Sequence, residues 1–170
     1  KAFVAGTDIS QFSEFKSGED GLRYERDGDQ RSGRIARVKK PVIAQIQGFA
    51  VGGGFGIAAG ADLRIATPDA RFGAPIARTL GNCLSAANYA RLLDMIGPSR
   101  VKDLLFTGRL IGATEAASLG LVTRMADPST IDEAVLELAA TIAANAPLTI
   151  RATKEAVRRI QTARRPSADA

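Results

Sequence analysis

The sequence predicts an α/β fold with a helical region at its C-terminal end. Short aliphatic runs that suit buried strands alternate with segments in which apolar residues recur at helical spacing. The chain has 170 residues, of which 45% are hydrophobic and only 5% aromatic. This is enough material for one domain, and its core is expected to be aliphatic and rich in alanine.

The expected elements follow from local patterns. Strands are predicted over residues 2–5, 41–47, 62–66, 71–72 and 121–125. Helices are predicted over residues 54–60, 84–95, 99–106, 114–119, 129–145 and 148–160. Asp8 suits the N-cap of a short helix. Residues 17–34 are polar, charged and interrupted by glycines, so we expect part of this segment to be mobile.

The charge of the chain is formally +5, from 23 Lys and Arg against 18 Asp and Glu. Basic residues gather between residues 31 and 40 and again between residues 151 and 165. A nucleic-acid-binding module is one interpretation, but stacking on bases uses aromatic side chains and neither cluster contains one. Solvated helix faces or attraction of a small phosphorylated ligand fit the clusters better.

Several classes are excluded by composition. The chain has no histidine, which rules out a Cys/His zinc site, and its one cysteine rules out a disulfide framework within the chain. We expect no metal, no membrane span, no signal peptide and a cytoplasmic setting. Because the chain begins without methionine in a strand-like stretch, we also expect it to be a fragment or a chain that is only partially ordered.

The glycine-rich stretch after residue 51 admits three interpretations. "GFGIAA", residues 54–59, matches one form of the dinucleotide-binding fingerprint, but no acidic residue ends a second strand about twenty positions on. A P-loop fails because no Gly-Lys-Ser or Gly-Lys-Thr occurs. Close packing of a helix is the second interpretation, and close approach of backbone to a reacting carbonyl is the third.

Three motifs favour the third interpretation. "AFVAGTDI", residues 2–9, resembles the A-F-x-A-G-x-D motif of the crotonase superfamily, the enoyl-CoA hydratases and isomerases. "KPVIAQIQGFAVGGGFGIAAGADLRIATPDARFGAP", residues 40–75, is similar to the central signature of that family. "FTGRLIGATEAASLGLVTRMAD", residues 106–127, is similar to its L-T-G-x-x-x-x-A-x-E-A-x-x-x-G-L-V stretch. The resemblance implies a spiral of repeated ββα units over residues 1–125, with the N-terminal part of the spiral absent, and an incomplete helical region over residues 126–170.

The resemblance also implies an activity. Enzymes of this family bind an acyl-CoA thioester and stabilise an enolate-like oxyanion with two backbone N–H groups, which correspond here to those of Ala5 and Gly53. No cofactor is implied, because coenzyme A is part of the substrate. A homotrimer or hexamer is implied as well. The residues implied to line the substrate are Lys1, Ala2, Ala5, Asp8, Ile9, Gly52, Gly53, Gly56, Pro75, Ile76 and Leu80.

The acid and base of the hydratases are missing from the corresponding positions. The first glutamate of those enzymes stands two residues after the third glycine, where this chain has Gly56. The second follows the proline of F-x-x-P, where this chain has Ile76, and a one-residue shift reaches only Ala77. Hydration requires positioned proton transfer, so ordinary hydratase activity is expected to be slow or absent. A non-catalytic acyl-CoA-binding or assembly subunit is therefore an open alternative.

Other residues were weighed as substitutes. Cys83 is a candidate nucleophile, although a lone cysteine is more often a small buried residue. The segment expected to border the acyl pocket carries three further acids, Glu14, Glu19 and Asp20. Asp62 is interpreted as structural. Lys1, together with Lys154, Arg158 and Arg159, is a candidate contact for the CoA phosphates.

Overall fold

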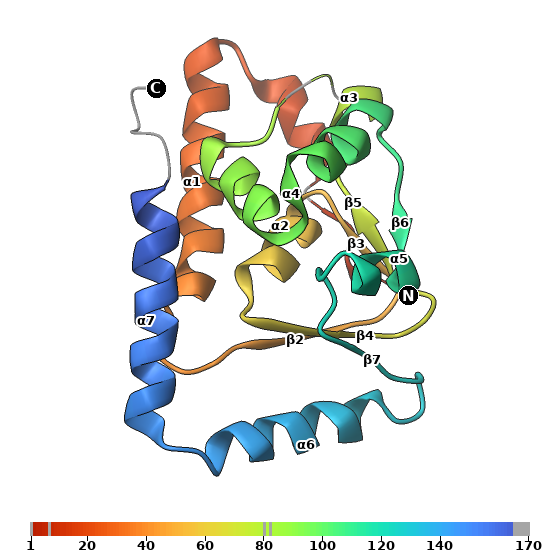
Figure 1. Ribbon diagram of the computed structural model, residues 1–170. Coiled ribbons are helices and arrows are strands. Elements are labelled where there is room, and N and C mark those ends of the chain that lie inside the picture. Colours follow the sequence, from red (N-terminus) through yellow and green to blue (C-terminus); the bar gives the residue numbers. More distant parts are fainter. Residues whose placement is uncertain (1, 7, 80, 82, 165–170) are drawn as a thin grey trace.

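The computed structural model describes residues 2–6, 8–79, 81 and 83–164, without the side chains of Ile9, Gln11 and Ser32. Two small sheets form its centre (Figure 1). One has the strand order β1-β3-β5-β6 and the other has the order β2-β4-β7. All strand pairs are parallel except β5 with β6.

The strands are short. They are β1 (Ala2–Val4), β2 (Ile43–Ile46), β3 (Phe49–Val51), β4 (Leu63–Ala66), β5 (Arg71–Gly73), β6 (Ile111–Gly112) and β7 (Arg124–Met125). The helices are the 3-10 helix η1 (Ile9–Glu14) and the α-helices α1 (Gly18–Arg37), α2 (Gly53–Gly60), α3 (Ile76–Thr79), α4 (Ala86–Thr107), α5 (Ala113–Ser118), α6 (Ile131–Ala143) and α7 (Pro147–Ala163).

The chain passes from one sheet to the other twice in the same sense. It leaves β2, turns at Gly48, enters β3 of the other sheet and then forms α2. It repeats this path through β4, β5 and α3. Parallel pairing of β2 with β4 and of β3 with β5 stacks the two units. The predicted α/β class and the spiral of ββα units are therefore confirmed.

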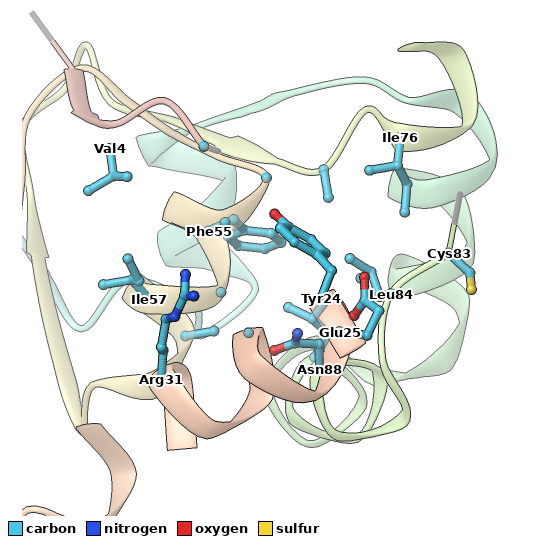
Figure 2. A pocket seen from close by; sticks show the side chains of 18 of the residues that line it. Val4, Tyr24, Glu25, Arg31, Phe55, Ile57, Ile76, Cys83, Leu84 and Asn88 are labelled. Atoms are coloured by element: carbon cyan, nitrogen blue, oxygen red, sulfur yellow. The ribbon is translucent and has the colours of Figure 1, made fainter. Parts of the chain in front are cut away.

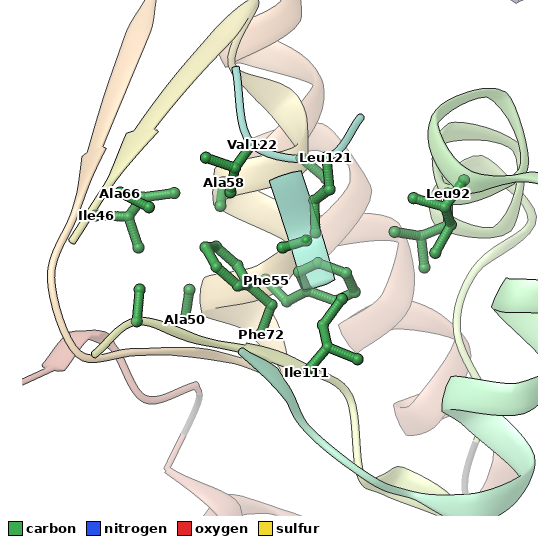
Figure 3. Packing of buried hydrophobic residues seen from close by; sticks show 14 of the residues in the cluster. Ile46, Ala50, Phe55, Ala58, Ala66, Phe72, Leu92, Ile111, Leu121 and Val122 are labelled. Carbon is green, nitrogen blue, oxygen red and sulfur yellow. The ribbon is translucent and has the colours of Figure 1, made fainter. Parts of the chain in front are cut away.

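The main core lies between the sheets and α2, α4 and α5 (Figure 3). Phe72, Ile46, Ile111 and Leu121 are fully buried there among small alanine side chains, as the aliphatic, alanine-rich composition predicts. Arg64 is also buried, and its guanidinium donates hydrogen bonds to the carbonyls of residues 58, 61 and 121. These bonds satisfy carbonyls at the C-terminal end of α2 and fix that helix against β4.

Residues 18–34 form a helix that the sequence pattern did not indicate, while the partial mobility predicted for residues 17–34 stays a prediction. This segment is α1, and the Asp20 carboxylate accepts hydrogen bonds from the Lys16 and Ser17 N–H groups at its N-terminus. Tyr24 packs against the rings of Phe12 and Phe15, with centroids 5.0 and 5.9 Å away. Glycine lowers the intrinsic helix propensity of the segment, but burial of one face compensates for it.

Smaller differences concern short elements. The strand β3, just before the glycine run, and the short helix α3, which begins at residue 76, were not predicted. By contrast, the two helices predicted over residues 84–95 and 99–106 are both present, because α4 consists of two helical parts separated by a kink at Gly97, whose φ of 74° and ψ of 166° are not helical. The strand β6 is only two residues long, and so short an element leaves almost no periodic signal.

The last two helices pack on the outside of the spiral core. α6 lies beneath the β2-β4-β7 sheet, and α7 continues upward to contact α4 (Figure 1). Within the described ranges, no single helix is long and apolar enough to cross a membrane; α6 and α7 reach that length and composition only as a pair, bent by 104°. The proposed boundary near residue 125 stays a prediction.

Candidate active site

The close approach of β1 to α2 forms one wall of the site. A Cβ on Gly54 would stand 2.0 Å from the Val4 carbonyl oxygen and 2.7 Å from the Val4 carbonyl carbon. No side chain fits in that space, so glycine at position 54 lets the Val4–Ala5 peptide lie directly against the first turn of α2. The N–H of this peptide belongs to Ala5.

The first turn of α2 has the geometry that its glycines permit. Gly52 is the N-cap with a φ of 58°, a left-handed value that side chains disfavour, and its N–H donates to the Gly73 carbonyl at 2.9 Å. The Gly56 N–H donates to the Gly52 carbonyl, closing the first helical turn. The N–H groups of the first residues in a helix have no partner within that helix. α2 therefore directs the positive end of its dipole towards this wall.

A cavity of about 270 Å³ lies beside these glycines (Figure 2). Val4 and Gly6 border it from β1 and the following turn, and α2 supplies the glycines at its N-terminal end. Figure 2 shows Tyr24 and Glu25 of α1 in its middle, with Phe55 and Leu84. The walls are mainly apolar, which is typical of a pocket for a small organic group.

Four of the predicted substrate residues line this cavity: Gly52, Gly53, Gly56 and Ile76. Ala5 does not itself line it, although the residues on both sides of it do. Ala2 pairs with Phe49 in the sheet, and Pro75 begins α3 by accepting the N–H groups of residues 78 and 79. Lys1 and Leu80 lie outside the described residues, as does the side chain of Ile9.

The acids that were weighed as substitutes lie elsewhere. Asp8 caps η1 by accepting the Ser10 N–H at 3.0 Å, which lowers the pKa of the Asp8 carboxyl, and it is not among the residues that line the cavity. Asp20 caps α1, and Glu19 forms an ion pair with Arg26. Glu14 ends η1 outside the cavity. Cys83 does line the cavity and is exposed.

The place of the first expected glutamate is adjacent to an amide side chain. A Cβ on Gly56 would meet Asn88 Oδ1 at 3.7 Å, an ordinary contact distance. Asn88 Oδ1 accepts a hydrogen bond from Arg91 Nη1 at 2.9 Å, and the Ser85 hydroxyl donates to Asp29 at 2.5 Å. Polar groups of α4 and α1 thus stand where α2 has no side chain.

Sequence reasoning missed Glu25. Among the described residues that line the cavity it is the only carboxylate. Burial raises the pKa of the Glu25 carboxyl, and the charge of Asp29, one helical turn further along α1, raises it further. The helical spacing of Tyr24, Glu25, Gly28 and Asp29 was the available signal, but it becomes visible only once the segment is known to be a helix.

The basic residues of α7 do not reach this cavity. Lys154 donates to the Asp62 carboxylate at 2.6 Å and to the Lys40 carbonyl at 2.9 Å. Arg158 and Arg159 both bind Glu155 and lower the pKa of its carboxyl to about 2. Lys154 and Arg158 line a second cavity of about 540 Å³ between α4 and α7. The ion pair between Lys154 and Asp62 holds α7 against the core.

No group of three or more potential metal-ligating side chains occurs in the part of the chain that the structure describes. The described part of the site combines backbone N–H groups, mainly apolar walls and the Glu25 carboxylate with the polar side chains of Tyr24, Arg31, Cys83 and Asn88. A family model described as "Enoyl-CoA hydratase/isomerase" matches residues 1–169. The chain belongs to this family.

Curated relatives agree with this membership. The short-chain-enoyl-CoA hydratase of Clostridium acetobutylicum is 39% identical over 159 residues, which cover 94% of this chain and 60% of the relative. The crotonyl-CoA hydratase of Syntrophomonas wolfei is 36% identical over 156 residues, which cover 92% of this chain and 59% of the relative. The chain thus spans about 60% of the length of these relatives.

Solved structures share the fold of this family member. An enoyl-CoA hydratase/carnithine racemase from Magnetospirillum magneticum superposes with a TM-score of 0.88 at 32% identity, covering 94% of this chain and 60% of the other. An enoyl-CoA hydratase from Bacillus anthracis superposes with a TM-score of 0.84 at 34% identity, covering 93% and 60%.

Proposed function

We propose that this family member is an enzyme that processes an acyl-CoA thioester by stabilising its enolate with the backbone N–H groups of Ala5 and Gly53. The observation that carries the proposal is the contact between Gly54 and Val4, which brings the Ala5 peptide against the first turn of α2 beside the cavity. The family and the names of the enoyl-CoA hydratase relatives support the substrate class.

The chemistry follows from the placement of fixed donors. Removing a proton next to a thioester carbonyl moves charge onto the carbonyl oxygen, and two backbone N–H groups in a water-poor site stabilise that charge without reorganising. The dipole of α2 acts in the same direction. Removal of one such donor typically lowers the rate about 100-fold or more. No cofactor beyond the CoA of the substrate is needed for this chemistry.

We further propose that hydration of a short enoyl-CoA is slow. Gly56 and Ile76 occupy the positions implied for the two hydratase glutamates, and both line the cavity without a group that can carry a proton. Turnover of crotonyl-CoA, followed by loss of its conjugated absorbance, tests this. We expect little turnover; a rate typical of the hydratases would contradict it.

The same replacement leaves a non-catalytic acyl-CoA-binding subunit as the second candidate. Binding and turnover distinguish the two candidates. An enzyme exchanges or transfers protons of the bound acyl group, whereas a binding subunit retains the thioester unchanged. A homotrimer or hexamer also stays part of the proposal, and exposed apolar side chains such as Phe106 and Leu136 suit an interface. Light scattering of the purified chain measures its mass.

A further inference from the structure

Glu25 differs from Glu19 and Asp29, two other acids of α1, in the contacts of its carboxylate. Within the described ranges, no hydrogen bond or ion pair engages its carboxylate, whereas Asp29 accepts the Ser85 hydroxyl and Glu19 binds Arg26. A carboxylate that is half buried in an apolar cavity without a partner is destabilised in its charged form. Asp20 caps the same helix and Glu19 pairs with Arg26, and Glu25 shares neither role.

Its surroundings disfavour the charged form of the Glu25 carboxyl. Burial raises the pKa of the Glu25 carboxyl, and the negative charge of Asp29 acts in the same direction. The other titratable groups on the cavity wall are Tyr24, Arg31 and Cys83, and the amide of Asn88 faces it from α4. A carboxyl whose charged form is disfavoured and that lies on the wall of an apolar cavity is a candidate for proton transfer.

The position of Glu25 is also suitable for contact with a bound acyl group. α1 packs against α2, so Glu25 faces the cavity from the side opposite the β1 wall, as Figure 2 shows with Val4 and Glu25 on different sides of Phe55. An acyl group whose thioester oxygen lies at the first turn of α2 would extend into the cavity towards α1. The carboxylate would then face the carbon next to the thioester.

We propose that Glu25 is the proton-transfer residue of this site, taking a proton from the carbon next to the thioester carbonyl and returning it. The inference rests on the proposed function. In the forward step the C–H bond breaks, its electron pair forms the carbon–carbon double bond of the enolate, and the carbonyl π pair moves to oxygen. The proton forms an O–H bond on Glu25. The reverse step restores the carboxylate, so no further reactant is consumed.

The test is exchange of the α-protons of butyryl-CoA in D₂O, followed by proton NMR. The wild-type chain is expected to exchange them, and Glu25→Gln is expected to lower the exchange rate about 100-fold or more while butyryl-CoA binding, measured by calorimetry, is retained. Glu19→Gln is the matched control, because Glu19 lies on the same helix with its carboxylate on Arg26. Glu25→Asp keeps the acid and should retain part of the exchange.

The outcomes separate the two proposals. Exchange by Glu25→Gln at the wild-type rate would overturn the role of Glu25 and leave the proposed function standing. Binding of butyryl-CoA by the wild-type chain without any exchange would overturn both, in favour of the binding subunit. Equal losses in Glu25→Gln and Glu19→Gln would assign the effect to the helix rather than to the carboxylate in the cavity, which also overturns the inference.

Discussion

The Val4 carbonyl oxygen lies 2.0 Å from the point where a Cβ on Gly54 would stand, much closer than two unbonded atoms can approach. Gly54→Ala is therefore expected to push β1 away from α2, destabilising the fold by about 1–3 kcal/mol and removing acyl-CoA turnover. Urea unfolding measures the first effect. Gly56→Ala is the control, because its Cβ would meet only Asn88 Oδ1 at 3.7 Å. Equal stability of the two variants would contradict the interpretation.

Glu25 gives the stability a pH dependence of known sign. The pKa of its carboxyl is raised above the ordinary 4.5, so the folded chain holds this proton more tightly than the unfolded chain. The contribution of Glu25 is therefore most favourable below pH 4.5 and is lost as the pH rises through the raised value. Glu25→Gln should remove this component. The difference in unfolding free energy between the wild type and Glu25→Gln is measured at a series of pH values, which cancels the titration of the groups that do not interact with Glu25.

A single carboxylate on the described cavity wall favours one type of reaction. Moving a double bond from the β,γ to the α,β position requires a proton to be taken and returned, which a single carboxylate can do. Hydration also requires activation of water. We expect a 3-enoyl-CoA to be converted to the conjugated thioester about 100 times faster than crotonyl-CoA is hydrated. The absorbance of the conjugated thioester follows both reactions, and faster hydration would contradict the prediction.

The pair of Asp62 and Lys154 gives a prediction about stability alone. Asp62 accepts from Lys154 at 2.6 Å and from the Val42 N–H at 2.7 Å, and the Lys154 side chain is only 12% exposed. Asp62→Ala leaves a nearly buried cation and an N–H without their acceptor, and is expected to destabilise the fold by about 2–4 kcal/mol. Adding Lys154→Met should restore part of the loss. The exposed Glu155→Ala is the control, with a smaller expected loss.

The glycine-rich turn could be predicted from sequence because its constraint is local. A run of glycines between a strand and a helix indicates backbone that must approach something closely, and in the structure Gly54 meets the Val4 carbonyl. The strands β2 and β4 could be predicted from sequence equally well, since both are short, mainly aliphatic runs that are buried on at least one face. The glycine-rich turn forms part of one wall of the cavity.

The opposite wall was not predictable in the same way. Four glycines and many charges conceal the helical character of α1, which depends on packing of Tyr24 against Phe12 and Phe15 and of α1 against α2. Glu25 was therefore not recognised, while Glu19 and Asp20 on the same helix were considered. Which of several acids faces a cavity depends on the rotation of the helix, and that rotation is determined by tertiary contacts.

The division of the cavity between two separate segments has a consequence for altering the proposed activity. The groups proposed to polarise the thioester are main-chain atoms of β1 and α2, whereas the side chain proposed to move the proton belongs to α1. Substitutions along the inner face of α1 can therefore change which carbon is protonated, or whether any is, without disturbing the main-chain donors. Different side chains on α1 would then direct the same enolate into different reactions.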